Sequence, residues 1–271
     1  MRSGDSISSR DSFRSSSFLP TPVTHRRNCM SAAVKRYRYL RRLFKFQQMD
    51  FEFAFWQMIN LFIAPQKVYR NFNYRKETKS QFARDDPAFL VLLGFWLFVA
   101  SIGFTYVLRL SIGGFFQFLL YVIFIDYIGF GICIATILWY VSNKFLLKPE
   151  YRNQDVEWGY AFDVHLNAYF PPLIILHIFQ LFFYNVFISQ DWFLSRLFGN
   201  SLWLISIGYY IYITFLGYTC LPIVHKTQVL LYPMIPLFFV YILSLAAGWN
   251  ITQTVMDVYL YRVIGHFHIG L

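Results

Sequence analysis

Residues Val34–Pro65 read VKRYRYLRRLFKFQQMDFEFAFWQMINLFIAP and lead toward the first of several long apolar runs. On a helical wheel this stretch has an apolar face and an opposite basic face. The apolar face carries Tyr37, Leu40, Phe44, Phe51, Phe55, Met58 and Phe62, and the basic face carries Lys35, Arg38, Arg42 and Lys45. The pattern is typical of a helix lying in a membrane surface, but the same face could instead pack on the protein's own membrane bundle. We expect the helix to end near Ala64, because proline disfavours helical geometry at the residue before it.

The composition is that of a membrane protein. Of the 271 residues, 57% are hydrophobic and only 14% are charged, whereas a soluble domain carries about 25% charged residues. The formal net charge of +10 belongs entirely to residues 1–87, which hold 17 of the 24 Lys and Arg and 7 of the 14 Asp and Glu. Positive charge is therefore concentrated before the first apolar run.

Four segments follow from these patterns. Residues 1–33 are rich in Ser and Arg and are expected to be a disordered tail. Residues 34–87 are a cytosolic amphipathic and juxtamembrane segment, residues 88–249 a membrane bundle, and residues 250–271 a short lumenal tail. Five runs within the bundle approach the roughly 20 residues that cross about 30 Å of hydrocarbon: Ala88–Leu108, Phe115–Val141, Ala168–Ser189, Leu202–Leu221 and Leu231–Trp249. The predicted fold class is an all-α integral membrane protein, a bundle of five transmembrane helices preceded by a basic amphipathic cytosolic helix.

The basic residues predict the orientation of these spans. With the N-terminus in the cytosol, the cytosolic parts hold 21 Lys and Arg and the lumenal parts hold only Arg109, Arg196 and Arg262. Cytosolic loops of membrane proteins carry such an excess. The C-terminus is then lumenal, and so is Asn250, which begins the sequon Asn250-Ile251-Thr252.

The connection Ser142–Asn167 is predicted to be the main cytosolic loop of the bundle. It contains four acids that could pair with the basic N-terminal helix: Glu150, Asp155, Glu157 and Asp163. Exposed pairs contribute only about 0–1 kcal/mol each. We therefore interpret them as determinants of docking specificity.

Asp126 lies in the middle of the second predicted span. A charged Asp at a helix centre costs roughly 2.5–3.5 kcal/mol on insertion scales, so it should face a polar partner or water. His177, in the third span, is the nearest candidate in depth, and Gln180 is another. The contact could clamp two helices, or it could form part of a proton or ion pathway in a small transporter. Among the motifs sought, no metal-ligand spacing or catalytic signature occurs, and we predict no enzyme activity, cofactor or metal.

Residues 66–87 interleave cations with aromatic side chains. Such interleaving is favoured at lipid headgroups and also occurs on RNA-binding surfaces. Both readings stay open, with membrane lipids the first expected partner and RNA the second.

Three long strings carry a resemblance to a known family. They are residues 41–52, RRLFKFQQMDFE; residues 74–89, YRKETKSQFARDDPAF; and residues 156–168, VEWGYAFDVHLNA. Over residues 35–260 the chain resembles the Unc-fifty (uncoordinated-fifty) family of Golgi membrane proteins, which is distantly similar to the Yip family. The resemblance implies five spans, a cytosolic N-terminus, and a place in the Golgi, endoplasmic reticulum or inner nuclear membrane. It further implies a role in assembly or surface delivery of cargo such as nicotinic acetylcholine receptors, a link to Arf guanine-nucleotide exchange factors or similar trafficking factors, and RNA binding in some members.

The predicted function is support of membrane-protein trafficking through a cationic docking surface. We expect residues 34–87 and the loop Ser142–Asn167 to recruit a trafficking factor. The residues expected to bind the membrane surface and the partner are Arg41, Arg42, Lys45, Arg75, Lys76, Lys79 and Arg84.

Overall fold

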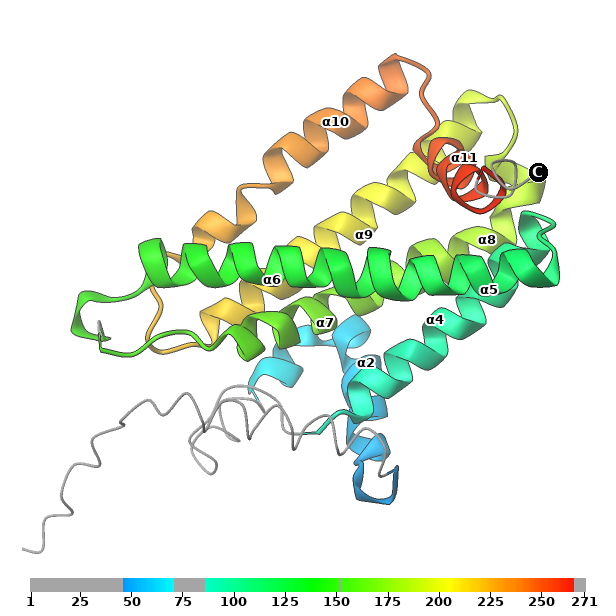
Figure 1. The fold of residues 1–271 in the computed structure, drawn as a ribbon. Helices are drawn as coiled ribbons and strands as arrows, with labels where there is room; N and C mark the ends of the chain where they lie inside the picture. The colour runs from blue at the N-terminus through cyan, green and yellow to red at the C-terminus, as the bar shows by residue number, and fades with distance from the viewer. Residues whose placement is uncertain (1–45, 71–85, 152, 266–271) are drawn as a thin grey trace, which may run out of the picture. The chain divides into compact units, whose positions relative to one another are not determined.

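A computed structural model describes residues 46–70, 86–151 and 153–265 of the chain (Figure 1). These residues fold into helices and contain no strand beyond an isolated antiparallel bridge between Leu147 and Val224. In chain order the elements are η1 (Phe46–Gln48), α2 (Phe51–Ile63), α4 (Ala88–Val107), α5 (Ile112–Leu120), η2 (Tyr121–Gly129), α6 (Phe130–Val141), η3 (Ser142–Leu146), η4 (Pro149–Tyr151), α7 (Trp158–Ile174), η5 (Ile175–Phe179), α8 (Gln180–Phe183), η6 (Tyr184–Ile188), α9 (Phe193–Thr219), η7 (Thr227–Leu231), α10 (Met234–Ala246) and α11 (Ile251–Ile264).

Within the described residues, five helical segments are long and apolar enough to cross a membrane, which confirms the predicted all-α membrane fold with five spans. They are Ala88–Val107, Ile112–Leu146, Trp158–Ile188, Phe193–Thr219 and Thr227–Ala246. The second and third are longer than the apolar runs predicted. They include π-helical stretches, η2 and η3 in the second span and η5 and η6 in the third.

Most of the predicted cytosolic loop Ser142–Asn167 is helical rather than loop. Residues 142–146 extend the second span and residues 158–167 form the first turns of α7, so that the connection itself is only residues 147–157. The sequence was misleading here because Asp163, His165 and Asn167 are polar yet buried. Consequently Pro171 and Pro172 lie inside the third span, and the π-helical stretch η5 follows directly after the helix that contains them.

The helix α7 occupies the centre of the bundle. It packs against α9, α6, α2 and α4, and residues on nearly all its sides are buried. The helix α10 is peripheral: it packs against α9 and buries only Ser244. Exposed phenylalanine, isoleucine and leucine side chains therefore cover most of the fifth span, as expected for a surface in contact with lipid.

The predicted amphipathic helix is interrupted where the structure describes it: η1 is a short 3-10 helix, and α2 begins only after Asp50, which is its N-cap. The helix α2 ends at Ile63 with Ala64 as its C-cap, which confirms the end predicted from Pro65. Its buried residues are Ala54, Gln57, Met58 and Leu61, and it packs against α4 and α7. One face of α2 is therefore docked on the bundle, while Phe55, Ile59 and Ile63 remain exposed on the other side.

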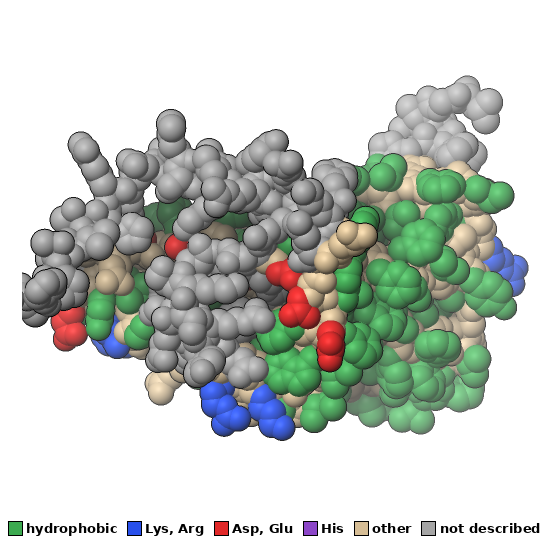
Figure 2. All heavy atoms as spheres, turned by 90° about the horizontal axis from the view of Figure 1, so that it is seen from below, with side chains coloured by type: hydrophobic (Ala, Val, Ile, Leu, Met, Phe, Trp, Pro, Cys, Tyr) green, Lys and Arg blue, Asp and Glu red, His purple; other side chains and the backbone are tan. Residues whose placement is uncertain are grey.

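Apolar side chains dominate one part of the surface that Figure 2 shows. Figure 2 shows a broad apolar area on one face, with acidic side chains grouped near the middle of the view. Large exposed hydrophobic residues on α4 include Phe95, Phe98, Ile102 and Tyr106. A surface of this kind requires a hydrocarbon environment, which agrees with the assignment of α4 as a span.

Candidate functional site

All seven cations predicted to form the docking surface lie outside the described residues. Arg41, Arg42 and Lys45 precede η1, and Arg75, Lys76, Lys79 and Arg84 fall between residues 70 and 86. The described helices next to these cations in the sequence include α2 and α4, and hydrogen bonds hold these two helices in place.

Hydrogen bonds join the start of α2 to the start of α4, on either side of the stretch that carries Arg75, Lys76, Lys79 and Arg84. The Asp50 side chain caps α2 by accepting from the Phe53 amide at 2.9 Å. The Asp50 amide in turn donates to Asp86 Oδ2 at 2.8 Å, and Asp86 Oδ1 accepts from the Ala88 amide at the start of α4 at 3.0 Å. These two acids lie in two of the three strings that carry the family resemblance. The fold therefore brings the starts of α2 and α4 together.

The third string supplies the buried contact beneath α2. Gln57 Nε2 of α2 donates to Asn167 Oδ1 of α7 at 3.0 Å, across 110 residues of sequence, and both side chains are buried. Farther along, the Tyr209 hydroxyl of α9 donates to the Phe62 carbonyl at 3.0 Å. Buried polar groups cost free energy unless they are paired, so these bonds fix the position of α2 on the bundle.

Asp126 and His177 both contact α11, through different residues. Arg262 of α11 donates to Asp126 Oδ1 at 2.8 Å. The Arg262 side chain is 32% exposed and the Asp126 side chain is 14% exposed. His177 Nε2 lies 3.4 Å from the Tyr259 hydroxyl. The bonded partner of Asp126 in this structure is thus Arg262 rather than His177. The other candidate, Gln180, donates to the Thr252 hydroxyl.

The surroundings of this ion pair are aromatic. The Tyr259 ring lies edge-on to the rings of Phe104 and Phe118, at 5.4 Å between centroids in each case. The Arg262 guanidinium carbon lies 5.9 Å from the centre of the Tyr259 ring. A cavity of only about 10 Å³ remains beneath α11, beside His177, and one water needs about 10–15 Å³. This cavity, which His177 and Tyr259 line, is therefore too small for a substrate.

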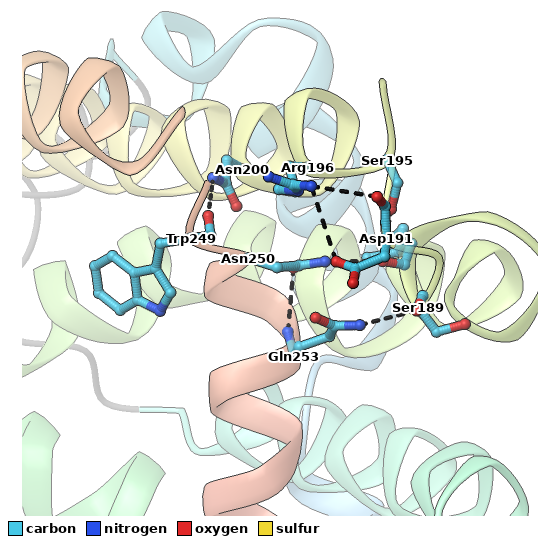
Figure 3. Close-up of polar contacts among 9 residues, drawn as sticks. Ser189, Asp191, Ser195, Arg196, Asn200, Trp249, Asn250 and Gln253 are labelled. Atoms are coloured by element: carbon cyan, nitrogen blue, oxygen red, sulfur yellow. Dashed lines mark hydrogen bonds and ion pairs between the residues drawn. The ribbon is translucent and has the colours of Figure 1, made fainter. Parts of the chain in front are cut away.

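A polar network holds the start of α11 (Figure 3). Asn250 Nδ2 donates to the Ile188 carbonyl at 2.8 Å, and Gln253 Nε2 donates to the Ser189 carbonyl at 2.8 Å. From α9, Asn200 donates to the Trp249 carbonyl at 2.9 Å. Close by, Arg196 donates to the Asp191 carbonyl at 3.2 Å. In Figures 1 and 3, α11 lies crosswise to α9, and this network joins it to the ends of the third and fourth spans.

The helix α11 differs from the expectation for residues 250–271, which the sequence predicts to be a short lumenal tail. A local signal was present: Asn250 stands three residues before Gln253, and its side chain accepts from the Gln253 amide at 3.2 Å. An N-cap residue followed three positions later by Glu or Gln is typical of a helix start. No local signal indicated that Arg262 would meet Asp126. Within the ranges the structure describes, no group of three or more His, Cys, Asp or Glu could hold a metal ion.

Comparisons with known proteins place these features in a family. The UNC-50 family model matches residues 39–260. A Drosophila melanogaster protein named "Protein unc-50 homolog" is 58% identical over 245 residues, which cover 90% of this chain and 89% of that protein. Proteins of the same name from Rattus norvegicus and Homo sapiens are 60% and 59% identical over 233 residues, 86% of this chain and 90% of theirs. No solved structure matches the chain.

Proposed function

Because this chain belongs to the UNC-50 family, we propose that it supports the assembly, trafficking or surface delivery of selected membrane proteins from the Golgi or endoplasmic reticulum. In this proposal the protein is not an enzyme. Its basic N-terminal segment faces the cytosol and recruits an Arf exchange factor or a similar trafficking factor. Its cargo are receptors such as the nicotinic acetylcholine receptors. The excess of Lys and Arg before the first span supports this orientation.

The observation that carries the proposal is the docking of α2. A cationic segment can recruit a partner at a defined place only if its attachment points are fixed. Asp86 fixes one end through its bond to the Asp50 amide, and the buried bond from Gln57 to Asn167 fixes α2 on the bundle. The seven predicted cations flank these elements in the sequence, Lys45 five positions before Asp50 and Arg84 two positions before Asp86.

The expected contribution of the cations is large enough to measure. Each Lys or Arg close to an anionic membrane surface contributes about 1 kcal/mol. Neutralising Arg75, Lys76, Lys79 and Arg84 together should then remove about 4 kcal/mol of binding free energy. This corresponds to a roughly thousandfold lower affinity of the segment for an anionic surface. Raised salt should weaken the same interaction, because exposed charges are screened.

The test is a cargo-delivery assay in cells that lack the endogenous protein. The variant carries Arg75→Gln, Lys76→Gln, Lys79→Gln and Arg84→Gln, and we measure receptor at the cell surface and exchange factor on Golgi membranes. The matched control carries Arg10→Gln, Arg14→Gln, Arg26→Gln and Arg27→Gln, which remove four cations from the tail that precedes the segment. We expect the first variant to fail in both measurements and the control to behave as wild type. Normal delivery by the first variant would contradict the proposed role of these cations.

The alternative functions give different results with related variants. RNA binding by residues 34–87 predicts crosslinking that falls steeply with salt and is lost in the same charge variant. Transport through Asp126 predicts that Asp126→Asn abolishes a measurable flux while leaving recruitment of the trafficking factor intact.

A further inference from the structure

A groove lies where the turn between α4 and α5 meets the end of the third span. Its volume is about 1120 Å³. The sides are formed by Phe98, Ile102 and Tyr106 of α4 and by Ile112 and Phe115 of α5. The rings of Phe98 and Phe115 meet edge to face at 5.8 Å between centroids, which joins the two helices along the groove. The residues used for the proposed trafficking function take no part in it.

The length of the groove along α4 matches the hydrocarbon thickness of one membrane leaflet. Val107, the last residue of α4, and Phe98 both line it. The nine residue steps between them correspond to about 14 Å along a helix axis. This is about half of the roughly 30 Å thickness of bilayer hydrocarbon. Since Ile102, Tyr106 and Ile112 are all more than half exposed, the groove opens onto the surface that lipid covers.

The end of the groove at the turn is polar. Arg109 and Asn185 line it there, and both are exposed. Among the residues that the structure describes, neither side chain forms a hydrogen bond or ion pair. Arg109 also has a backbone φ of 52°. The left-handed region costs a residue other than glycine roughly 1–2 kcal/mol. The turn thus presents an uncompensated cation from a position where glycine would be unstrained.

We propose that this groove binds one phospholipid molecule, with its phosphate at Arg109 and one acyl chain lying between α4 and α5. The apolar walls and their depth match an acyl chain of a single leaflet. The phosphate supplies the negative charge that Arg109 lacks, and guanidinium groups bind phosphate oxygens through charge-assisted hydrogen bonds. Asn185 adds a neutral amide donor next to the same phosphate.

Native mass spectrometry of the detergent-purified full chain tests this assignment. The protein is titrated with phosphatidylserine, phosphatidylcholine and diacylglycerol, which lacks the phosphate. We expect a one-to-one adduct with phospholipid and at least about tenfold weaker binding of diacylglycerol, because one charge-assisted hydrogen bond is worth about that factor. Arg109→Asn should weaken phospholipid binding by a similar factor, and asparagine tolerates the left-handed backbone better than most residues.

Two pairs of variants separate the groove from the rest of the lipid-facing surface. Ile102→Trp should fill the groove and abolish the adduct, whereas Ile137→Trp, at an exposed position of α6, should not. Lys144→Gln removes a cation from the other end of the second span and should leave binding unchanged. If Ile102→Trp does not fold, Arg109→Asn decides alone. The proposal would be overturned by equal affinity for diacylglycerol and phospholipid, or by unchanged phospholipid binding in Arg109→Asn. It would also be overturned if the wild-type protein were a dimer that Ile102→Trp dissociates.

Discussion

Replacing Arg262 by Gln should destabilise the protein more than replacing Asp126 by Asn, although both changes break the same 2.8 Å ion pair. The asymmetry follows from what each variant leaves behind. Arg262→Gln leaves a carboxylate that is 14% exposed, in the middle of the second span, whereas Asp126→Asn leaves a guanidinium that is 32% exposed. A stranded charge costs more where it has less access to water.

The magnitudes can be worked from the geometry. Removing one partner of a fully buried ion pair costs about 3–5 kcal/mol. Because Arg262 is about one-third exposed, we expect about 2–3 kcal/mol for Arg262→Gln and about 1 kcal/mol for Asp126→Asn. The double variant leaves no charge unpaired, so its cost should be about 2 kcal/mol less than the sum of the single costs.

The assay is thermal unfolding of the four proteins in detergent, followed by size-exclusion chromatography. One kcal/mol shifts the midpoint by about 2–4 °C in a chain of this size. Arg262→Gln should then lower the midpoint by about 5–10 °C, and adding Asp126→Asn should recover part of that loss. Strictly additive single effects would refute the inferred ion pair, and a larger loss in Asp126→Asn than in Arg262→Gln would refute the reasoning from exposure.

Three further outcomes are expected. Gly131→Ala should lower the unfolding midpoint, because its Cβ would lie 2.7 Å from His165 Nε2, whereas the control Gly94→Ala meets no atom within 4 Å and should not; equal losses would contradict this. Asn250 should carry no glycan, because it is 6% exposed and both its side-chain polar atoms are hydrogen-bonded. Endoglycosidase treatment should therefore leave the gel mobility unchanged, and a shift would show that the network in Figure 3 does not form. Gln57→Ala should lose about 1–3 kcal/mol in the same unfolding assay, since it removes the buried bond that holds α2; an unchanged midpoint would argue against that docking.

The sequence predicted that Asp126 needs a polar partner, but it did not predict which residue that partner is. Asp126 was recognisable as an unusual residue, because an isolated acid in an apolar run needs a partner. Its bonded partner lies 136 positions away in a helix that the composition did not reveal. The third span likewise begins ten residues earlier than its apolar run, because Asp163, His165 and Asn167 are polar residues of a helix interior.

The sequence by itself determined the five spans, the end of α2 at Ala64 and the concentration of cations before the first span. Each of these follows from a local quantity: the number of apolar residues that crosses the hydrocarbon, the geometry before a proline, and a count of charges. Only the tertiary structure decided that α2 docks on α7, that α11 lies across the ends of the spans, and that Arg262 meets Asp126. These contacts join residues from 49 to 136 positions apart in the sequence, and their free energy depends on burial that no local pattern encodes.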